Sequence, residues 1–484
     1  MKTTLRNLLL AGIALAFSTS ALAQIARFKH VVIIFQENRS PDNLFQGLCV
    51  SGSSCSTHPT GNQYNIQISN WLDNNSPGGL IQPLPVPLAS AYDLHHSHPV
   101  WAKQCDPDAN GACRMDGASR VPCDPVAACN KFPHPQFRFV DNSTGILNSY
   151  LALAKQYGWA NYMFQTNQGS SFPAHQFIFG GTSAPLVNSS VNDDALGIFA
   201  AESPSGPSGS AGCIAPAGTT VQLIDVSGER PGNTIYPCFE HQTIADMLDK
   251  ANPAISWKYY TPGAGSIWTA PNAIKHICQP NQPTGGQCKG ADWVKDVDLR
   301  PADVLTDIGN CSLPGVSWVM PTGANSDHAG INTGGGPSWV ASIVNTIGKN
   351  TTCDGTGYWK DTAILITWDD WGGWYDHEPP TILPSPQGDY QLGFRVPLIF
   401  VSAYTPVGYV NNERHDFGSL LRFIELNTSL GEGALGFADA RATTDLRNFY
   451  DLTKAPRVFQ VIPATHGAKY FINDQTPPTD PDDD

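Results

Sequence analysis

A continuous run of β-branched and aromatic residues, from Val31 to Phe35, is the feature that most constrains the fold of this chain. A strand that is apolar at successive positions must be covered on both faces, as in a parallel sheet packed between helices. The run ends abruptly at Glu37-Asn38-Arg39. Either the chain reaches the surface there, or these groups are held at the strand end for chemistry. Arg39 could pair with a phosphate or bridge to a carboxylate such as Asp42.

The rest of the chain repeats this pattern of buried strands separated by helices. Strands are predicted at 30–36, 255–260, 316–320, 362–367 and 396–401. Helices are predicted at 149–157, 243–251, 338–347 and 417–426. The third helix follows Pro337 and ends at Gly348, as helices commonly do. This alternation predicts an α/β fold with a mostly parallel central sheet and helices on both faces.

Polar residues lie in the segments that follow three of the predicted strands. They are Glu37 and Asn38 after 30–36, Asp327 and His328 after 316–320, and Asp369, Asp370 and His377 after 362–367. In open parallel sheets, ligands bind outside the carboxyl ends of the strands. We therefore expect these side chains to form one site.

The adjacent carboxylates Asp369 and Asp370 indicate a metal. Two buried negative groups so close together repel each other, and a cation removes that conflict. With Glu37 and Asn38 they offer four oxygen ligands, a set that suits a divalent ion. The alternative is that Asp369 and Asp370 only cap the turn at Gly372-Gly373.

A second motif places a serine at the predicted start of a helix. In the sequence SSFPAHQF, Ser171 precedes Pro173, and proline is common in the first turn of a helix. The dipole and the unpaired N–H groups of a helix N-terminus favour anions, so Ser171 is well placed to attack a phosphate. The alternative is that Ser170 or Ser171 is only an N-cap.

Histidines form a third set of candidates. The sequence DLHHSHPVW carries three, at positions 95, 96 and 98. His328 lies in a glycine-rich loop after a strand and is a candidate acid or phosphate ligand. His377 could serve the reaction or could instead fix its own turn.

The cysteines favour disulfides over a zinc or redox site, because none of the 12 lies in a C-x-x-C motif. The close pairs are Cys49/Cys55, Cys105/Cys113, Cys123/Cys129 and Cys278/Cys288. Connectivity does not follow from sequence, and pairing of neighbours is the first hypothesis. The 45 glycines and 39 prolines imply long loop insertions, which these disulfides would staple.

Residues 1–23 have the pattern of a secretory signal peptide. Lys2 and Arg6 precede an apolar stretch, and Ala21-Leu22-Ala23 resembles a cleavage site. We expect a secreted or periplasmic protein, because no later stretch is long and apolar enough to cross a bilayer. A single α/β domain is predicted over 24–472, followed by a disordered acidic tail over 473–484.

The net charge of −14 argues against a nucleic-acid binder. It does not exclude a phosphate substrate, because salt screens distant charges beyond about 8–10 Å. An anion site would have to be made positive locally, by a metal, an arginine or a helix N-terminus.

Short motifs along the chain resemble the bacterial phospholipase C and acid phosphatase family of phosphoesterases, which are secreted relatives of the alkaline phosphatase fold. In order, they are QENRSPDNLFQG, DLHHSH, RMDG, SFPAHQ, SDH and WDDWGGWYDHEPP. The resemblance extends from about His30 to about Phe423, and its first and last motifs are long and specific.

The resemblance implies a role for each matching residue. Glu37, Asn38, Asp369 and Asp370 would hold one divalent metal ion, Ser171 would be the nucleophile and a further metal ligand, His96 and His328 would bind phosphate or serve the leaving group, and His377 matches the Asp-His turn of the family. The phospholipase C branch typically has threonine at the position of Ser171, so the chain resembles the acid phosphatase branch more closely.

These observations lead to the hypothesis of a secreted, metal-dependent phosphoesterase that acts as an acid-phosphatase-like phosphomonoesterase. One alternative is a phospholipase C acting on phospholipid diesters. Another is a secreted binding protein that keeps the fold and the metal without turnover. The sequence predicts neither the metal, the natural substrate nor the oligomeric state.

Overall fold

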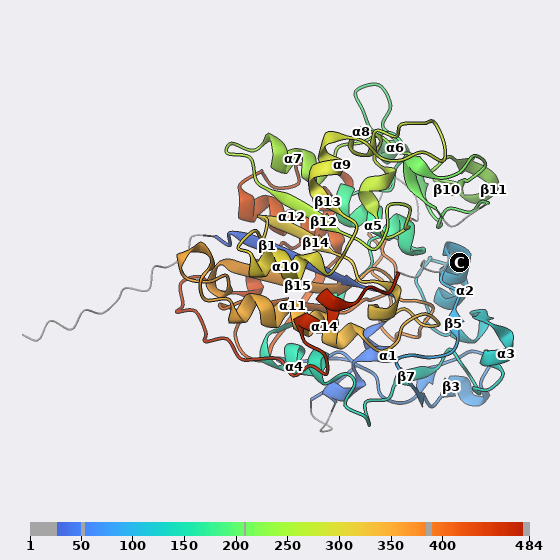
Figure 1. The fold of residues 1–484 in the computed structure, drawn as a ribbon. Coiled ribbons are helices and arrows are strands. Elements are labelled where there is room, and N and C mark those ends of the chain that lie inside the picture. The colour runs from blue at the N-terminus through green and yellow to red at the C-terminus, as the bar shows by residue number, and fades with distance from the viewer. Residues whose placement is uncertain (1–26, 50–53, 208–209, 384–389, 478–484) are drawn as a thin grey trace, which may run out of the picture.

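The computed structural model of the protein describes residues 27–49, 54–207, 210–383 and 390–477. An eight-stranded sheet, in the order β13-β12-β14-β1-β15-β16-β8-β17, runs through the middle of the molecule (Figure 1). Its strands are β1 (His30–Gln36), β8 (Gly158–Met163), β12 (Trp257–Tyr260), β13 (Val297–Asp298), β14 (Val316–Val319), β15 (Thr362–Trp368), β16 (Leu398–Val401) and β17 (Tyr409–His415).

The sheet is mostly parallel, as predicted. β16 is antiparallel to both of its neighbours, β15 and β8, whereas all other neighbouring strands are parallel. All five predicted strands form and belong to this sheet. The sequence did not predict β8 and β17, because GWANYM and YVNNERH mix polar and small residues with apolar ones.

Two layers of helices cover the sheet (Figure 1). One layer contains α4 (Asn148–Gln156), α10 (Asp303–Gly309), α11 (Gly336–Lys349) and α14 (Ala468–Asn473), and the other contains α5 (Ser171–Gly180), α7 (Ile244–Lys250) and α12 (Phe417–Thr428). The predicted helices correspond to α4, α7, α11 and α12, so helices on both faces are confirmed.

The two faces of the sheet can be assigned from the strand register. Phe35 of β1 pairs with Thr367 of β15, and successive side chains in a strand point to opposite faces. Phe35 contacts Phe417 of α12, whereas Trp368, the next residue after Thr367, contacts Tyr150 of α4. The α5–α12 layer therefore covers the face to which Phe35 points.

Segments between the sheet elements form small structures of their own, among them a three-stranded sheet of β9, β10 and β11. Their elements are α1 (Pro41–Leu44), β2 (Trp71–Leu72), β3 (Leu80–Ile81), β4 (Leu84–Val86), β5 (Asp93–Leu94), α2 (His98–Cys105), β6 (Cys123–Asp124), α3 (Val126–Cys129), β7 (Arg138–Val140), α6 (Asp193–Leu196), β9 (Phe199–Ala200), β10 (Val221–Asp225), β11 (Gly228–Ile235), α8 (Lys275–Cys278), α9 (Ala291–Asp296) and α13 (Phe437–Arg441).

Disulfides staple several of these segments. The pairs are Cys49–Cys55, Cys105–Cys113, Cys123–Cys129, Cys213–Cys238, Cys278–Cys288 and Cys311–Cys353. Each pair joins cysteines that are neighbours along the chain, so the first hypothesis for the pairing is confirmed. Disulfides persist in oxidising compartments, and this set is typical of an extracellular or periplasmic protein.

The predicted signal peptide, 1–23, lies outside the described residues, as does 478–484 of the predicted tail. Residues 474–477 follow α14 and form neither helix nor strand. Among the described residues, no helix combines the length and the apolar character that crossing a bilayer requires.

The strand directions place the carboxyl ends of four strands at one edge of the sheet. β14, β1 and β15 are parallel, and β8 shares their direction because it is antiparallel to β16, which is antiparallel to β15. The chain continues from these strands toward Asp327, Glu37, Asp369 and Ser171 respectively. The polar residues that follow the strands therefore share one edge.

Candidate active site

The predicted metal ligands and the predicted nucleophile meet at this edge. The backbone N–H of Asn38 donates to Asp369 Oδ1 over 3.2 Å, and Ser171 Oγ donates to Asp370 Oδ2 over 3.1 Å. All four residues are buried, as is Glu37. Residues from three distant parts of the chain are thus in direct contact or adjacent to one another.

Strand geometry explains why two of the carboxylates face the same helix. Glu37 follows Phe35 by two residues, and Asp369 follows Thr367 by two, so both extend the face of the sheet that α5 covers. At Asn38 the backbone turns into the left-handed region, with φ of 62°, which asparagine tolerates better than most residues.

The turn after Asp370 packs tightly against Asn38. Gly372 has φ of 61°, and a Cβ on it would lie 2.5 Å from the carbonyl oxygen of Asn38, so glycine is required here. One oxygen of Asp370 accepts from the N–H of Gly372, as the turn-capping alternative predicts. The other oxygen accepts from Ser171, so Asp370 both caps the turn and holds the serine.

Among the described residues, no lysine or arginine forms an ion pair with Glu37, Asp369 or Asp370. Burial, followed by repulsion from Asp369, raises the pKa of Glu37 well above its usual value. The same two causes raise the pKa of Asp370 to about 8. Glu37 and Asp370 are therefore held where ionisation is costly.

A divalent cation fits this arrangement. Both oxygens of Glu37, Oδ1 of Asn38 and Oδ2 of Asp369 are buried and have no hydrogen-bond partner among the described residues. Buried polar atoms are normally paired, so a set of unpaired oxygens from three residues needs an explanation. Carboxylate and amide oxygens are typical ligands of hard divalent ions, and a cation among them would satisfy these atoms.

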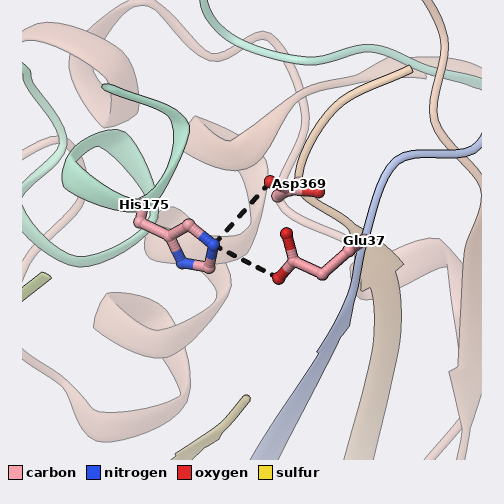
Figure 2. Close-up of side chains that lie close together, drawn as sticks. All are labelled: Glu37, His175 and Asp369. Carbon is pink, nitrogen blue, oxygen red and sulfur yellow. Dashed lines mark ion pairs between the residues drawn. The ribbon is translucent and has the colours of Figure 1, made fainter. Parts of the chain in front are cut away.

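His175 belongs to this cluster although the sequence analysis did not identify it. Its Nε2 lies 3.4 Å from Glu37 Oε1 and 3.7 Å from Asp369 Oδ2, and Figure 2 shows the ring directed at both carboxylates. These three residues can supply ligand atoms that all lie within 4.8 Å of one another. His175 follows Ser171 by one helical turn on α5, a spacing that could have identified it.

The imidazole of His175 is neutral at ordinary pH. Burial lowers its pKa to about 4, although the charge of Asp369 acts in the opposite direction. Neither ring nitrogen has a hydrogen-bond partner among the described residues. A neutral imidazole with an available lone pair is a common metal ligand, so His175 is a further candidate ligand.

His96 and His328 lie together beside the carboxylates, with ring centroids 6.1 Å apart. His96 Nε2 is 3.1 Å from Asn38 Nδ2 and 3.8 Å from Asp370 Oδ2. Nδ1 of His96 donates to the carbonyl of Leu94, and Nδ1 of His328 donates to that of Ala329. These bonds assign the proton of each neutral ring to Nδ1, so Nε2 is the atom that gains or loses a proton.

His377 lies in a different cluster. Its Nδ1 is 2.7 Å from Asp42 Oδ2 and its Nε2 is 2.9 Å from Asn65 Oδ1. Arg395 binds Asp376 in the same network through two hydrogen bonds. None of the recorded contacts of His377 involves the predicted metal ligands or Ser171, and the contacts that it makes fix its turn. A catalytic role for His377 stays a prediction.

The predicted bridge from Arg39 to Asp42 is wrong, whereas the pairing of Arg39 with a phosphate stays a prediction. Its guanidinium donates to the backbone carbonyls of Asp327 and Leu88 and to the side chain of Asn43, and it makes no ion pair with Asp42 among the described contacts. Arg39 therefore ties the end of β1 to the loop that carries His328.

The pKa of Asp370 predicts how the metal-free protein responds to pH. An unperturbed aspartate titrates near 3.8, whereas Asp370 titrates near 8 in the folded protein. Between these values the folded state binds more protons than the unfolded state, so the free energy of unfolding falls as pH rises. Mn²⁺ should therefore raise the melting temperature more near pH 8 than near pH 5. Thermal melts in chelator and in Mn²⁺ measure this difference. An equal gain at both pH values would contradict the account.

Replacing His175 tests whether it helps to hold a cation. We expect His175→Ala to weaken Mn²⁺ binding by about 10–100-fold, the usual loss when a residue that supports a metal site is removed. The matched control is His415→Ala, because His415 is also buried but bonds to Asn411 and Thr444. Calorimetric titration should show altered affinity only in the first variant. Equal affinities in both variants would remove His175 from the site.

Comparisons with known proteins identify the family of this chain. The profile of the Phosphoesterase family matches residues 28–431. The chain is 25% identical over 234 residues to phospholipase C A of Mycobacterium tuberculosis, a match covering 44% of this chain and 43% of that protein. It is 23% identical over 432 residues to the non-hemolytic phospholipase C of Pseudomonas aeruginosa, covering 82% of this chain and 53% of that protein.

The chain thus spans about half the length of the curated relatives that it matches. Among solved structures, a protein in the alkaline phosphatase superfamily from Vibrio parahaemolyticus overlaps 61% of this chain and 64% of its own, with a TM-score of 0.32 and 11% identity. Because this TM-score is low, the fold is described from the strand order and strand directions of this chain alone. The family profile covers most of the sequence and agrees with the resemblance drawn from the short motifs. The chain therefore belongs to the Phosphoesterase family.

Proposed function

We propose that this protein hydrolyses phosphate monoesters and that Ser171 is the nucleophile. The observation that carries the proposal is the hydrogen bond from Ser171 Oγ to Asp370 Oδ2 at the first residue of α5. This contact places a hydroxyl beside the carboxylate cluster and at a helix end that favours anions. Membership of the Phosphoesterase family supports the reaction class.

A metal ion would be held by Glu37, Asn38, Asp369, Asp370 and Ser171, with His175 as the added candidate. When bound, a divalent ion would neutralise charge on the phosphoryl oxygens and make the serine hydroxyl more acidic. Without a cation, the negatively charged phosphate would lie next to three carboxylates.

The chain's own residues supply the remaining chemistry. Ser171 Oγ gives its proton to Asp370 Oδ2, to which it is hydrogen-bonded, and attacks phosphorus in line; the bond from phosphorus to the ester oxygen breaks and a phosphoserine forms. The imidazolium form of His96 or His328, protonated on both ring nitrogens, gives its Nε2 proton to the departing alkoxide, since Nδ1 of each ring is committed to a backbone carbonyl. Water then attacks the phosphoserine and loses one proton to the same histidine Nε2, while the departing Ser171 Oγ takes back the proton held by Asp370, which releases inorganic phosphate and restores the serine.

The proposed setting is outside the cell or in a periplasm. The six disulfides favour an oxidising compartment. The signal pattern over residues 1–23 agrees with export. The proposed partner is a phosphate ester, and the net charge of −14 disfavours nucleic acid.

A phospholipase C activity is the second candidate. The names of the relatives from Mycobacterium tuberculosis and Pseudomonas aeruginosa favour it. Both candidates use the same nucleophile and break a phosphorus–oxygen bond. They differ in whether the phosphorus carries one ester group or two.

The nucleophile can be tested by removing its hydroxyl. Ser171→Ala should lower the rate on p-nitrophenyl phosphate by at least about a thousandfold, because a missing nucleophile costs most of the catalysis that a covalent mechanism provides. Phosphate release by the purified protein measures this.

Ser170→Ala is the matched control for that experiment. Ser170 is the neighbouring buried serine, and its Oγ accepts from the backbone N–H of Ser203 rather than contacting Asp370. We expect the control to keep most of the activity. Retained activity in Ser171→Ala would exclude the assignment, and phosphate release by no form of the protein would favour a binding protein without turnover.

Paired substrates separate the two candidate activities. The proposal expects faster hydrolysis of p-nitrophenyl phosphate than of its phosphorylcholine ester, because the position of the nucleophile is occupied by serine as in the acid phosphatase branch. The measurement is kcat/KM for both compounds under the same conditions. A preference for the phosphorylcholine ester would instead support phospholipase C.

A further inference from the structure

A cleft of about 430 Å³ lies next to the candidate active site. Its walls come from α2, from the β10–β11 hairpin and from residues 380–382 and 390–392, the first two of which lie on the right of Figure 1. The volume is within the range of sites that bind small organic molecules. Neither the family assignment nor the proposed chemistry gives this cleft a role.

Two of its lining residues are close in sequence to catalytic candidates. His98, in the wall, follows His96 by two residues, and its Nδ1 bonds to the carbonyl of Gln168 over 2.8 Å. Gln168, also in the wall, precedes Ser171 by three residues. The segments that carry the proposed acid and the nucleophile are thus bonded to each other at the cleft.

A chain of aromatic contacts joins the cleft to the carboxylates. Trp101 in the wall stacks on Phe394, with ring centroids 5.4 Å apart. Phe394 packs edge-on against Trp371 at 5.3 Å, and Trp371 directly follows Asp370. The three segments that carry His96, Ser171 and Asp370 therefore all support this cleft.

The lining is suited to an apolar group. Trp101, Tyr390, Leu392, Val226 and Ile382 contribute aromatic and aliphatic surface. Among the described lining residues, Asp225 is the one carboxylate, and it is paired with Arg230 and also accepts from Ser227. A charged group would lose water here and meet no unpaired opposite charge among the described lining residues, whereas a ring or alkyl chain would gain contact area.

We infer that this cleft binds the leaving group of the substrate, and that the preferred leaving group is a hydrophobic, ring-bearing or alkyl alcohol. The inference rests on the proposed function and adds a substrate class to it. Phosphorus would lie at Ser171 and the ester oxygen would point toward the cleft, where His96 can protonate it. Val226 and Ile382 form the rim, with 60% and 53% of their surface exposed.

The rim residues allow a test that does not disturb the core. We expect Val226→Ser combined with Ile382→Ser to lower kcat/KM for 2-naphthyl phosphate by about tenfold, because apolar contact with the ring is lost. The value for glycerol 3-phosphate, whose leaving group is small and polar, should change by less than about twofold. The unsubstituted protein should prefer 2-naphthyl phosphate.

The matched control is Val407→Ser combined with Val458→Ser. Both residues are exposed valines, at 68% and 87%, and neither lines the cleft. Val407 follows β16, whose reversed direction puts its carboxyl end at the opposite edge of the sheet. This variant should behave like the unsubstituted protein with both esters.

The outcomes separate this inference from the proposed function. Equal kcat/KM for the two esters, or an equal fall for both in the rim variant, would overturn the inference while leaving the hydrolase intact. If neither ester is hydrolysed, the proposed function fails, and calorimetric titration with 2-naphthyl phosphate then tests the cleft directly. Binding that is weakened only in the rim variant supports the cleft. No binding, or binding that the rim variant leaves unchanged, overturns it.

Discussion

The structure depends on one electrostatic constraint, which is that Glu37, Asp369 and Asp370 are buried together and that, among the described residues, no lysine or arginine pairs with them. Burial and mutual repulsion raise the pKa of Glu37 and of Asp370, so the protein alone does not stabilise their ionised forms. Several of their oxygens also lack hydrogen-bond partners among the described residues. A charge from outside the chain resolves both difficulties, and a hydroxyl and two imidazoles lie around the place where that charge would be.

The fold builds this cluster by ending several strands at one edge. β1 and β15 deliver the carboxylates, and β8 leads into α5, whose first residue is Ser171. The same helix returns His175 to the carboxylates one turn later. At the end of β1, Arg39 donates to the backbone carbonyl of Asp327, in the loop that carries His328, and to that of Leu88. The cleft beside α2 extends this arrangement outward to the part of a substrate that would leave.

Much of this could be predicted from the sequence, because buried strands leave a strong signal. The apolar runs identified five strands, and the polar residues after them identified Glu37, Asn38, Asp369 and Asp370. β8 was missed because its residues lack that apolar run, although it leads to Ser171. His175 was missed because its significance depends on a turn of helix and on strands far away in sequence. The contacts of Arg39 could not be predicted, because it binds backbone carbonyls, which every residue type has.

The most direct test of the central claim is to locate the cation. Crystals grown with Mn²⁺ would be measured at its absorption edge, where anomalous scattering identifies the ion. The account predicts a peak about 2.0–2.6 Å from oxygens of Glu37, Asp369 and Asp370, within the usual range for oxygen ligands of divalent ions. A lysine or water in that position with no anomalous signal, or a peak remote from these carboxylates, would contradict the account.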